Sequence, residues 1–76
     1  MGTWERKSET FWMYHLPGEA LIYGYVVRRL PAVPSAMAWD ALVASPQGKE
    51  DVPVRSGVSL DEAKGAIERA ADERRP

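Results

Sequence analysis

The stretch SLDEAKGAIERAADER, residues 59–74, decides the architecture of this chain, because it carries the signals of an amphipathic helix together with its own start. Ser59 and Glu62 form a capping box: the serine oxygen accepts from the backbone N–H of Glu62, and the glutamate reaches back to the serine N–H. Asp61 and Glu62 also place negative charge at the positive end of the helix dipole. The stretch therefore predicts a helix over residues 59–74 with a defined first turn.

Apolar residues recur along this helix at steps of three and four, which gives it one apolar face. These residues are Leu60, Ala63, Ile67, Ala70 and Ala71. Because most of them are alanines, the helix contributes little volume and must lie close against a surface that supplies large side chains. Gly65 costs about 1 kcal/mol relative to alanine inside a helix. Either a close backbone approach requires this glycine or an exposed side of the helix tolerates it.

The length and composition predict one soluble domain. A chain of 76 residues is near the lower size at which a single core is stable without disulfides or metals. The sequence has no cysteine, which excludes disulfides, cysteine zinc sites and thiolate nucleophiles. No apolar run approaches the roughly 18 residues of a membrane helix, and the start, MGTWERKSET, lacks a signal-peptide core. We therefore expect a cytoplasmic protein that makes no membrane contact.

The charges are nearly balanced, with 10 Lys and Arg against 11 Asp and Glu and a formal net charge of −1. Nucleic-acid-binding proteins usually carry a basic excess, because neutralised phosphates supply most of their non-specific affinity. A nucleic-acid partner would therefore require a local basic patch.

The residues before the helix predict three strands. Residues 1–9 are polar apart from Trp4, so we expect an N-terminal arm or an edge segment pinned by that indole. Residues 10–15 (TFWMYH) and 20–30 (ALIYGYVVRRL) are rich in the aromatic and β-branched residues that favour strands. Pro17 and Gly18 between them are typical of a type II turn. Residues 36–44 (AMAWDALVA) predict a third strand, with a short helix as the alternative because of the alanines.

The segment at residues 45–57 is expected to be a turn with a charged tip, followed by an optional short edge strand around Val54. Pro53 restricts such a strand to an edge of the sheet. The predicted fold is therefore α+β: a three-stranded antiparallel sheet packed on one C-terminal helix (βββα), with residues 1–9 as an arm and 10–76 as the domain.

One helix covers only one face of such a sheet, and the strands carry bulky side chains on both faces. We therefore expect aromatic side chains on an open face, next to the arginine pair. Trp, Tyr and Arg dominate the energetics of protein interfaces. The candidate partner-binding residues are Trp12, Tyr14, Arg28, Arg29 and Trp39. The alternative is that the rings fold over the sheet edge and that the N-terminal arm covers them.

No motif in the sequence indicates catalysis, a cofactor or a metal. Neither a phosphate-binding glycine loop nor a G-x-S-x-G nucleophile motif is present. His15, the only histidine, has no carboxylate or nucleophile beside it in the sequence. Asp40 is either a half-exposed strand residue or a buried carboxylate. We expect a protein that is not an enzyme and has no catalytic, cofactor or metal site.

Several short motifs resemble the plant ethylene-response (Apetala-type) DNA-binding domain and the similar three-strand-plus-helix modules of integrases and small phage proteins. The motifs are YGYVVRR at 23–29, WDAL at 39–42, SLDEAK at 59–64 and AA at 70–71. In that family the arginines and tryptophans of the sheet contact the major groove, which would implicate Arg28, Arg29 and Trp39. The third predicted strand departs from the family, since it has Asp40 and alanines where the family has basic residues.

The chain also resembles, in size and composition, the small cysteine-free inhibitors with which phages block host machinery, anti-CRISPR proteins among them. The first functional hypothesis is therefore a non-enzymatic protein-binding module, a monomer or homodimer, that inhibits a host nucleic-acid-handling defence complex. The alternative is a DNA-binding domain that uses the same arginines.

Overall fold

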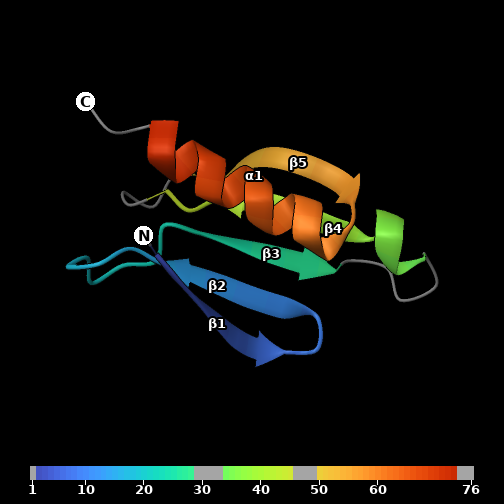
Figure 1. Cartoon of the computed structure of the whole chain (residues 1–76), viewed down its shortest axis with the longest axis horizontal. Coiled ribbons are helices and arrows are strands. Elements are labelled where there is room, and N and C mark those ends of the chain that lie inside the picture. Colours follow the sequence, from blue (N-terminus) through green and yellow to red (C-terminus); the bar gives the residue numbers. More distant parts are fainter. Residues whose placement is uncertain (1, 29–33, 46–49, 74–76) are drawn as a thin grey trace.

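The computed structural model describes residues 2–28, 34–45 and 50–73, which form a five-stranded antiparallel sheet with one α-helix against one face (Figure 1). The strands lie in chain order across the sheet. The elements are β1 (Thr3–Ser8), β2 (Phe11–His15), β3 (Gly24–Arg28), the 3-10 helix η1 (Ser35–Met37), β4 (Trp39–Val43), β5 (Val52–Val58) and α1 (Leu60–Glu73). The predicted α+β class is confirmed. The predicted number of strands is wrong, because the sheet has five strands rather than three.

The strand β1 accounts for one difference, since it lies within the segment expected as an N-terminal arm. It pairs with β2, and Trp4 lies opposite Tyr14 with the ring centroids 4.7 Å apart. Of the two expectations for residues 1–9, an arm or an edge segment pinned by Trp4, the second matches this arrangement. An edge strand needs few apolar residues, and charges on it discourage unwanted pairing, so β1 leaves little trace in the hydrophobic pattern.

The strand β5 accounts for the other difference. It forms the opposite edge of the sheet and contains both Pro53 and Val54, at the place where the sequence suggested an optional edge strand. The strand predicted at 36–44 starts only at Trp39, because Ser35–Met37 forms the 3-10 helix. The strand predicted at 20–30 begins at Gly24, and Arg29 lies outside the described residues.

The turn between β2 and β3 has the predicted geometry. The backbone N–H of Glu19 donates to the carbonyl of Leu16 at 3.2 Å, and Gly18 has a φ of 77°. This combination with Pro17 at the first central position is that of a type II turn.

The helix α1 begins where predicted, and one half of the capping box is present, because the hydroxyl of Ser59 accepts from the backbone N–H of Glu62 at 3.2 Å. The hydrogen bonds of the described residues do not include the predicted reciprocal bond from the Ser59 N–H to the Glu62 carboxylate. Ala63, Ile67 and Ala71 are buried on its sheet-facing side. A Cβ at Gly65 would meet no atom within 4 Å, so this glycine is explained by tolerance and not by close approach. No helix in the described parts of the chain is long and apolar enough to span a membrane.

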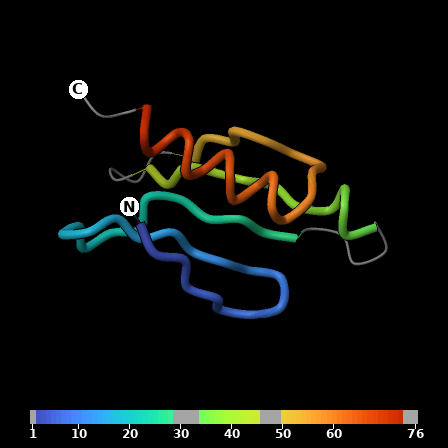
Figure 2. The backbone as a smooth tube through the Cα atoms, viewed as in Figure 1, coloured from blue at the N-terminus to red at the C-terminus, as the bar shows by residue number. Residues whose placement is uncertain are grey.

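The core lies between α1 and the strands β3, β4 and β5, which the helix contacts (Figure 2). Gly24 shows how close the two layers are, because a Cβ there would lie 3.2 Å from Cδ1 of Ile67. Ile67 therefore packs directly on the backbone of β3. The buried side chains of this core include Tyr14, Val26, Trp39, Ala41, Ala63 and Ile67.

Candidate protein-interaction surface

The candidate residues chosen from the sequence do not form an open face. Residues paired across antiparallel strands share a face of the sheet. Trp12 pairs with Val26, Tyr14 with Gly24, and Arg28 with Trp39, so all four described candidates lie on the side of the sheet where Ile67 packs. Tyr14 is 5% exposed and Trp39 is 3% exposed. The prediction that these two rings are presented on an open face is therefore wrong.

Trp12 is half-buried, and the ammonium group of a lysine on α1 lies over its ring. The ammonium of Lys64 lies 3.5 Å from the centroid of the Trp12 ring and 5.4 Å from that of Trp4. Glu68, one turn further along α1, accepts from the indole N–H of Trp4 at 3.0 Å. These contacts hold the aromatic side chains of β1 and β2 against α1, so Trp12 is part of the packing between helix and sheet.

The opposite face of the sheet carries a different set of apolar side chains. Phe11 pairs with Val27, and Met13 pairs with Tyr25. The rings of Phe11 and Tyr25 lie 5.4 Å apart with an interplanar angle of 31°. All four side chains are half-buried, and α1 lies on the other side of the sheet. We call Phe11, Met13, Tyr25 and Val27 the helix-free patch.

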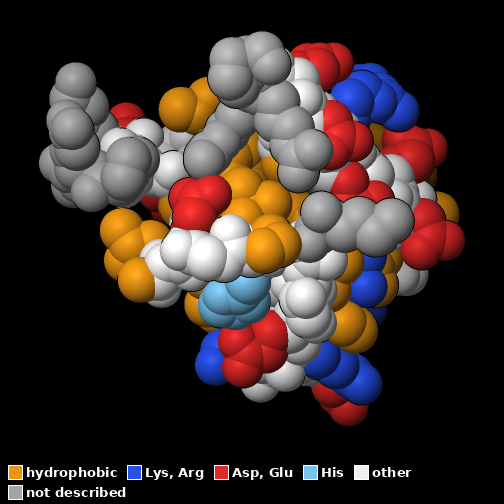
Figure 3. Space-filling model, turned by 60° about the vertical axis from the view of Figure 1, so that its left-hand side comes forward, with side chains coloured by type: hydrophobic (Ala, Val, Ile, Leu, Met, Phe, Trp, Pro, Cys, Tyr) orange, Lys and Arg blue, Asp and Glu red, His pale blue; other side chains and the backbone are white. Residues whose placement is uncertain are grey.

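Charged side chains from β1 border this patch. Glu5, which pairs with Met13, lies 3.1 Å from Nζ of Lys7 and 2.9 Å from Nε2 of His15. The hydrogen bond from Lys7, followed by that from His15, holds the pKa of Glu5 below its ordinary value. In Figure 3 the single histidine, in pale blue, lies at the surface beside acidic and hydrophobic side chains. The sequence did not reveal the Glu5 partner of His15, because residues 1–9 were expected to be an arm.

Asp51 holds Tyr25, a residue of the helix-free patch, through a hydrogen bond. The hydroxyl of Tyr25 donates to one oxygen of this carboxylate at 2.5 Å, and the backbone N–H of Ser45 donates to the other at 3.1 Å. The hydrogen bond from Tyr25 is the main cause of a lowered pKa of Asp51, and that from Ser45 adds to it. The Tyr25 ring is thus tied at its outer end to the segment before β5.

Asp40 has a structural role next to these residues. Its side chain is 9% exposed and accepts from the backbone N–H of Gly57 at 3.0 Å. Gly57 has a φ of 66° at an irregularity in the pairing of β5 with β4, where an extra residue leaves a backbone N–H without a ladder partner. The alternative of a buried carboxylate is therefore the one observed.

The described residues contain no group of three or more His, Cys, Asp or Glu side chains that could hold a metal ion. No protein-family model, curated protein or solved structure gives a significant match to the chain.

The link between Tyr25 and Asp51 leads to a first prediction. The Tyr25→Phe variant removes the main cause of the lowered pKa, so the pKa of Asp51 is expected to rise toward its ordinary value of 3.8. The hydrogen bonds to the carboxylate stabilise the fold at pH values above that ordinary pKa, and this contribution is lost as the pH falls through the lowered folded-state pKa. A carboxyl-detected NMR titration measures the shift. The matched variant Tyr23→Phe should leave the pKa of Asp51 unchanged, and an unchanged value in Tyr25→Phe would contradict the assignment.

Proposed function

We propose that the chain is a non-enzymatic protein-binding module that contacts its partner through the helix-free patch. The observation that carries this proposal is the composition of the face opposite α1. One-sided antiparallel sheets usually present polar residues to water, whereas here two aromatic rings, a methionine and a valine adjoin one another. An apolar centre with a charged rim is the usual anatomy of a protein interface, and aromatic residues and methionine are enriched there.

The patch is also held in place before a partner arrives. Tyr25 is fixed between the Phe11 ring and the Asp51 carboxylate. Side chains that are already ordered lose less conformational entropy on binding, which increases the affinity for a given contact area. In the rim, Glu5 is similarly connected to Lys7 by an ion pair and to His15 by a hydrogen bond.

A DNA duplex fits this face less well than a protein does. Arg28 and Trp39, which would contact DNA by analogy with the Apetala-type domain, lie on the same face as the core around Ile67. The helix-free side instead bears the carboxylates of Glu5 and Asp51 next to the patch, and these would repel phosphates. The partner class expected from the sequence, a host nucleic-acid-handling defence complex, remains part of the proposal.

The variant Met13→Arg tests the proposed surface. An arginine at the centre of the patch places a charge where the partner would bury apolar area, and the hot-spot residues that cluster at the centre of an interface contribute about 2 kcal/mol or more. We expect capture of purified candidate defence complexes by the immobilised protein to weaken about 30-fold or more, since each 1.4 kcal/mol is tenfold. Circular dichroism should show that the variant keeps its fold.

Met37→Arg is the matched control, because Met37 is 61% exposed and lies on η1, outside the patch. It should bind like the unaltered chain. Equal capture by both variants would show that the patch is not the contact surface. Sedimentation in the absence of a partner shows whether a second copy occupies the patch, and binding to duplex DNA that falls steeply with salt would favour the nucleic-acid alternative.

A further inference from the structure

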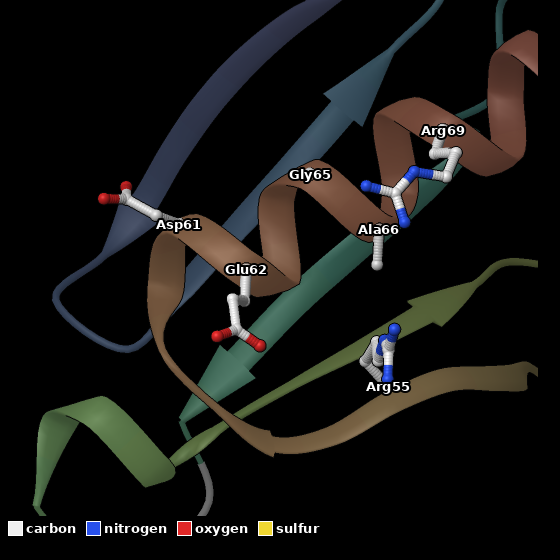
Figure 4. A pocket seen from close by; sticks show the side chains of 6 residues that line it. All are labelled: Arg55, Asp61, Glu62, Gly65, Ala66 and Arg69. Atoms are coloured by element: carbon white, nitrogen blue, oxygen red, sulfur yellow. The ribbon is translucent and has the colours of Figure 1, made fainter.

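A groove runs along α1 on the side that faces β5 (Figure 4). Its first part is a hollow of about 380 Å³ lined by Arg55, Asp61, Glu62, Gly65, Ala66 and Arg69. A second hollow of about 190 Å³ shares three of these residues and continues to Val54, Ala70 and Glu73. The two form one groove that follows the helix from Glu62 to Glu73, a length of about 16 Å at 1.5 Å per residue.

The groove exists because both of its walls are locally unusual. In β5, Arg55 pairs with Ala41 and Pro53 with Leu42, so Val54 is an extra residue on the edge strand. Such a bulge bends the strand and redirects its side chains. On α1 the groove side has small residues, and the space beside Gly65 is open enough that a Cβ would contact nothing within 4 Å.

Two arginines point into this groove from opposite walls, Arg55 from β5 and Arg69 from α1 (Figure 4). Both residues are exposed. Within the described part of the chain, neither guanidinium lies within ion-pair distance of a carboxylate. Guanidinium groups form strong contacts with carboxylates and phosphates, often through two parallel hydrogen bonds.

The charges along the groove alternate in sign. Glu62 points into the hollow from the first turn of the helix (Figure 4), and Asp61 lines the same end. Glu73 lines the other end, beyond Arg69. From one end to the other the order is negative, positive and negative, with an apolar floor at Ala66 and Ala70.

We propose that this groove binds an extended segment of a partner protein that carries one carboxylate between two basic residues. In an extended peptide of five residues the first and fifth Cα atoms are about 14 Å apart, and long basic side chains at these two positions extend this to the length of the groove. The first, third and fifth side chains point the same way. The central carboxylate lies between Arg55 and Arg69, and the flanking basic residues reach Glu62 and Glu73. The groove and the helix-free patch are separate surfaces, so this inference goes beyond the proposed function.

The probe for the test is the fluorescently labelled peptide lysine–valine–glutamate–valine–lysine with blocked ends. We expect it to bind the full chain and to shift the amide NMR signals of residues around Ala66. The charge-reversed peptide glutamate–valine–lysine–valine–glutamate should bind at least tenfold more weakly. In the Arg69→Gln and Arg55→Gln variants the affinity for the first peptide should fall about tenfold or more, as expected for a lost charge-assisted hydrogen bond.

Arg6→Gln is the matched control, since it removes one positive charge from β1, on the opposite edge of the sheet. This variant and Met13→Arg should both bind the peptide like the unaltered chain, which separates this proposal from the one on the helix-free patch. Equal binding of the two peptides, displacement of the peptide by acetate or inorganic phosphate at similar concentration, or unchanged affinity in both arginine variants would overturn the proposal.

Discussion

Replacement of Trp39 by alanine is expected to lower the free energy of unfolding by about 3–5 kcal/mol, the usual cost of deleting a large buried aromatic side chain. Trp39 is 3% exposed in the core between sheet and helix, and it pairs with Arg28 on one side and Val58 on the other. A domain of this length has a total stability of about 4–11 kcal/mol. We therefore expect the variant to lose a large part of its total stability, measured as a lower midpoint of urea denaturation by circular dichroism.

Two further variants separate the packing of Trp39 from its hydrogen bond. Trp39→Phe retains much of the ring volume and should cost clearly less than Trp39→Ala. Ser35→Ala removes only the acceptor of the indole N–H, at 3.4 Å, and should cost less than about 1 kcal/mol. Full stability of Trp39→Ala together with loss of partner binding would show that the ring is a contact residue, as the sequence suggested, and not part of the core.

The elements that the sequence predicted correctly are those whose signals are local. The capping serine lies three residues before its partner, and the Pro17–Gly18 turn is complete within four residues. Both act through hydrogen bonds between near neighbours, so no knowledge of the rest of the fold is needed to recognise them.

The sequence did not predict β1 as a strand and predicted β5 only as an optional one. The residues of these edge strands are suited to their place in the folded sheet and carry no clear local strand pattern. β1 buries only part of one indole, and its remaining side chains are mostly charged or polar. In β5, Pro53 and the extra residues near Val54 and Gly57 break the alternation by which a strand is usually recognised. Edge strands commonly carry such features because they prevent pairing with other chains.

The candidate site was misplaced for a related reason. In the sequence Phe11 and Met13 alternate with Trp12 and Tyr14, so both faces of this strand are bulky, and bulk alone does not show which face the helix covers. The helix lies close to the sheet, and Ile67, the one bulky residue among its buried side chains, needs small residues directly beneath it. Gly24 on β3 and Ala41 on β4 lie on the same face as Tyr14 and supply that space. Gly24 therefore indicates which face the helix covers, but only when it is considered together with the size of the helix residues.

Substitutions of Ile67 test which face of the sheet the helix covers. Ile67 is 0% exposed and is one of the two largest fully buried side chains of the described residues. We expect Ile67→Ala to lower the free energy of unfolding by about 2–5 kcal/mol and Ile67→Val by only about 0.5–1.5 kcal/mol. The matched change Asp72→Ala, at an exposed position of the same helix, should cost much less. Similar losses for Ile67→Ala and Asp72→Ala would contradict the packing of Ile67 in the core.

Gly24→Ala completes a double-mutant cycle with Ile67→Ala. In the unaltered chain the new Cβ would lie 3.2 and 3.3 Å from two carbons of Ile67 and 2.7 Å from the carbonyl oxygen of Leu42, so we expect a loss of about 1–3 kcal/mol. Ile67→Ala removes the first two contacts and leaves the third. The losses should therefore be less than additive, with a coupling of about 0.5 kcal/mol or more. Additive losses would show that Ile67 does not rest on β3, and that the helix does not select its face of the sheet through Gly24.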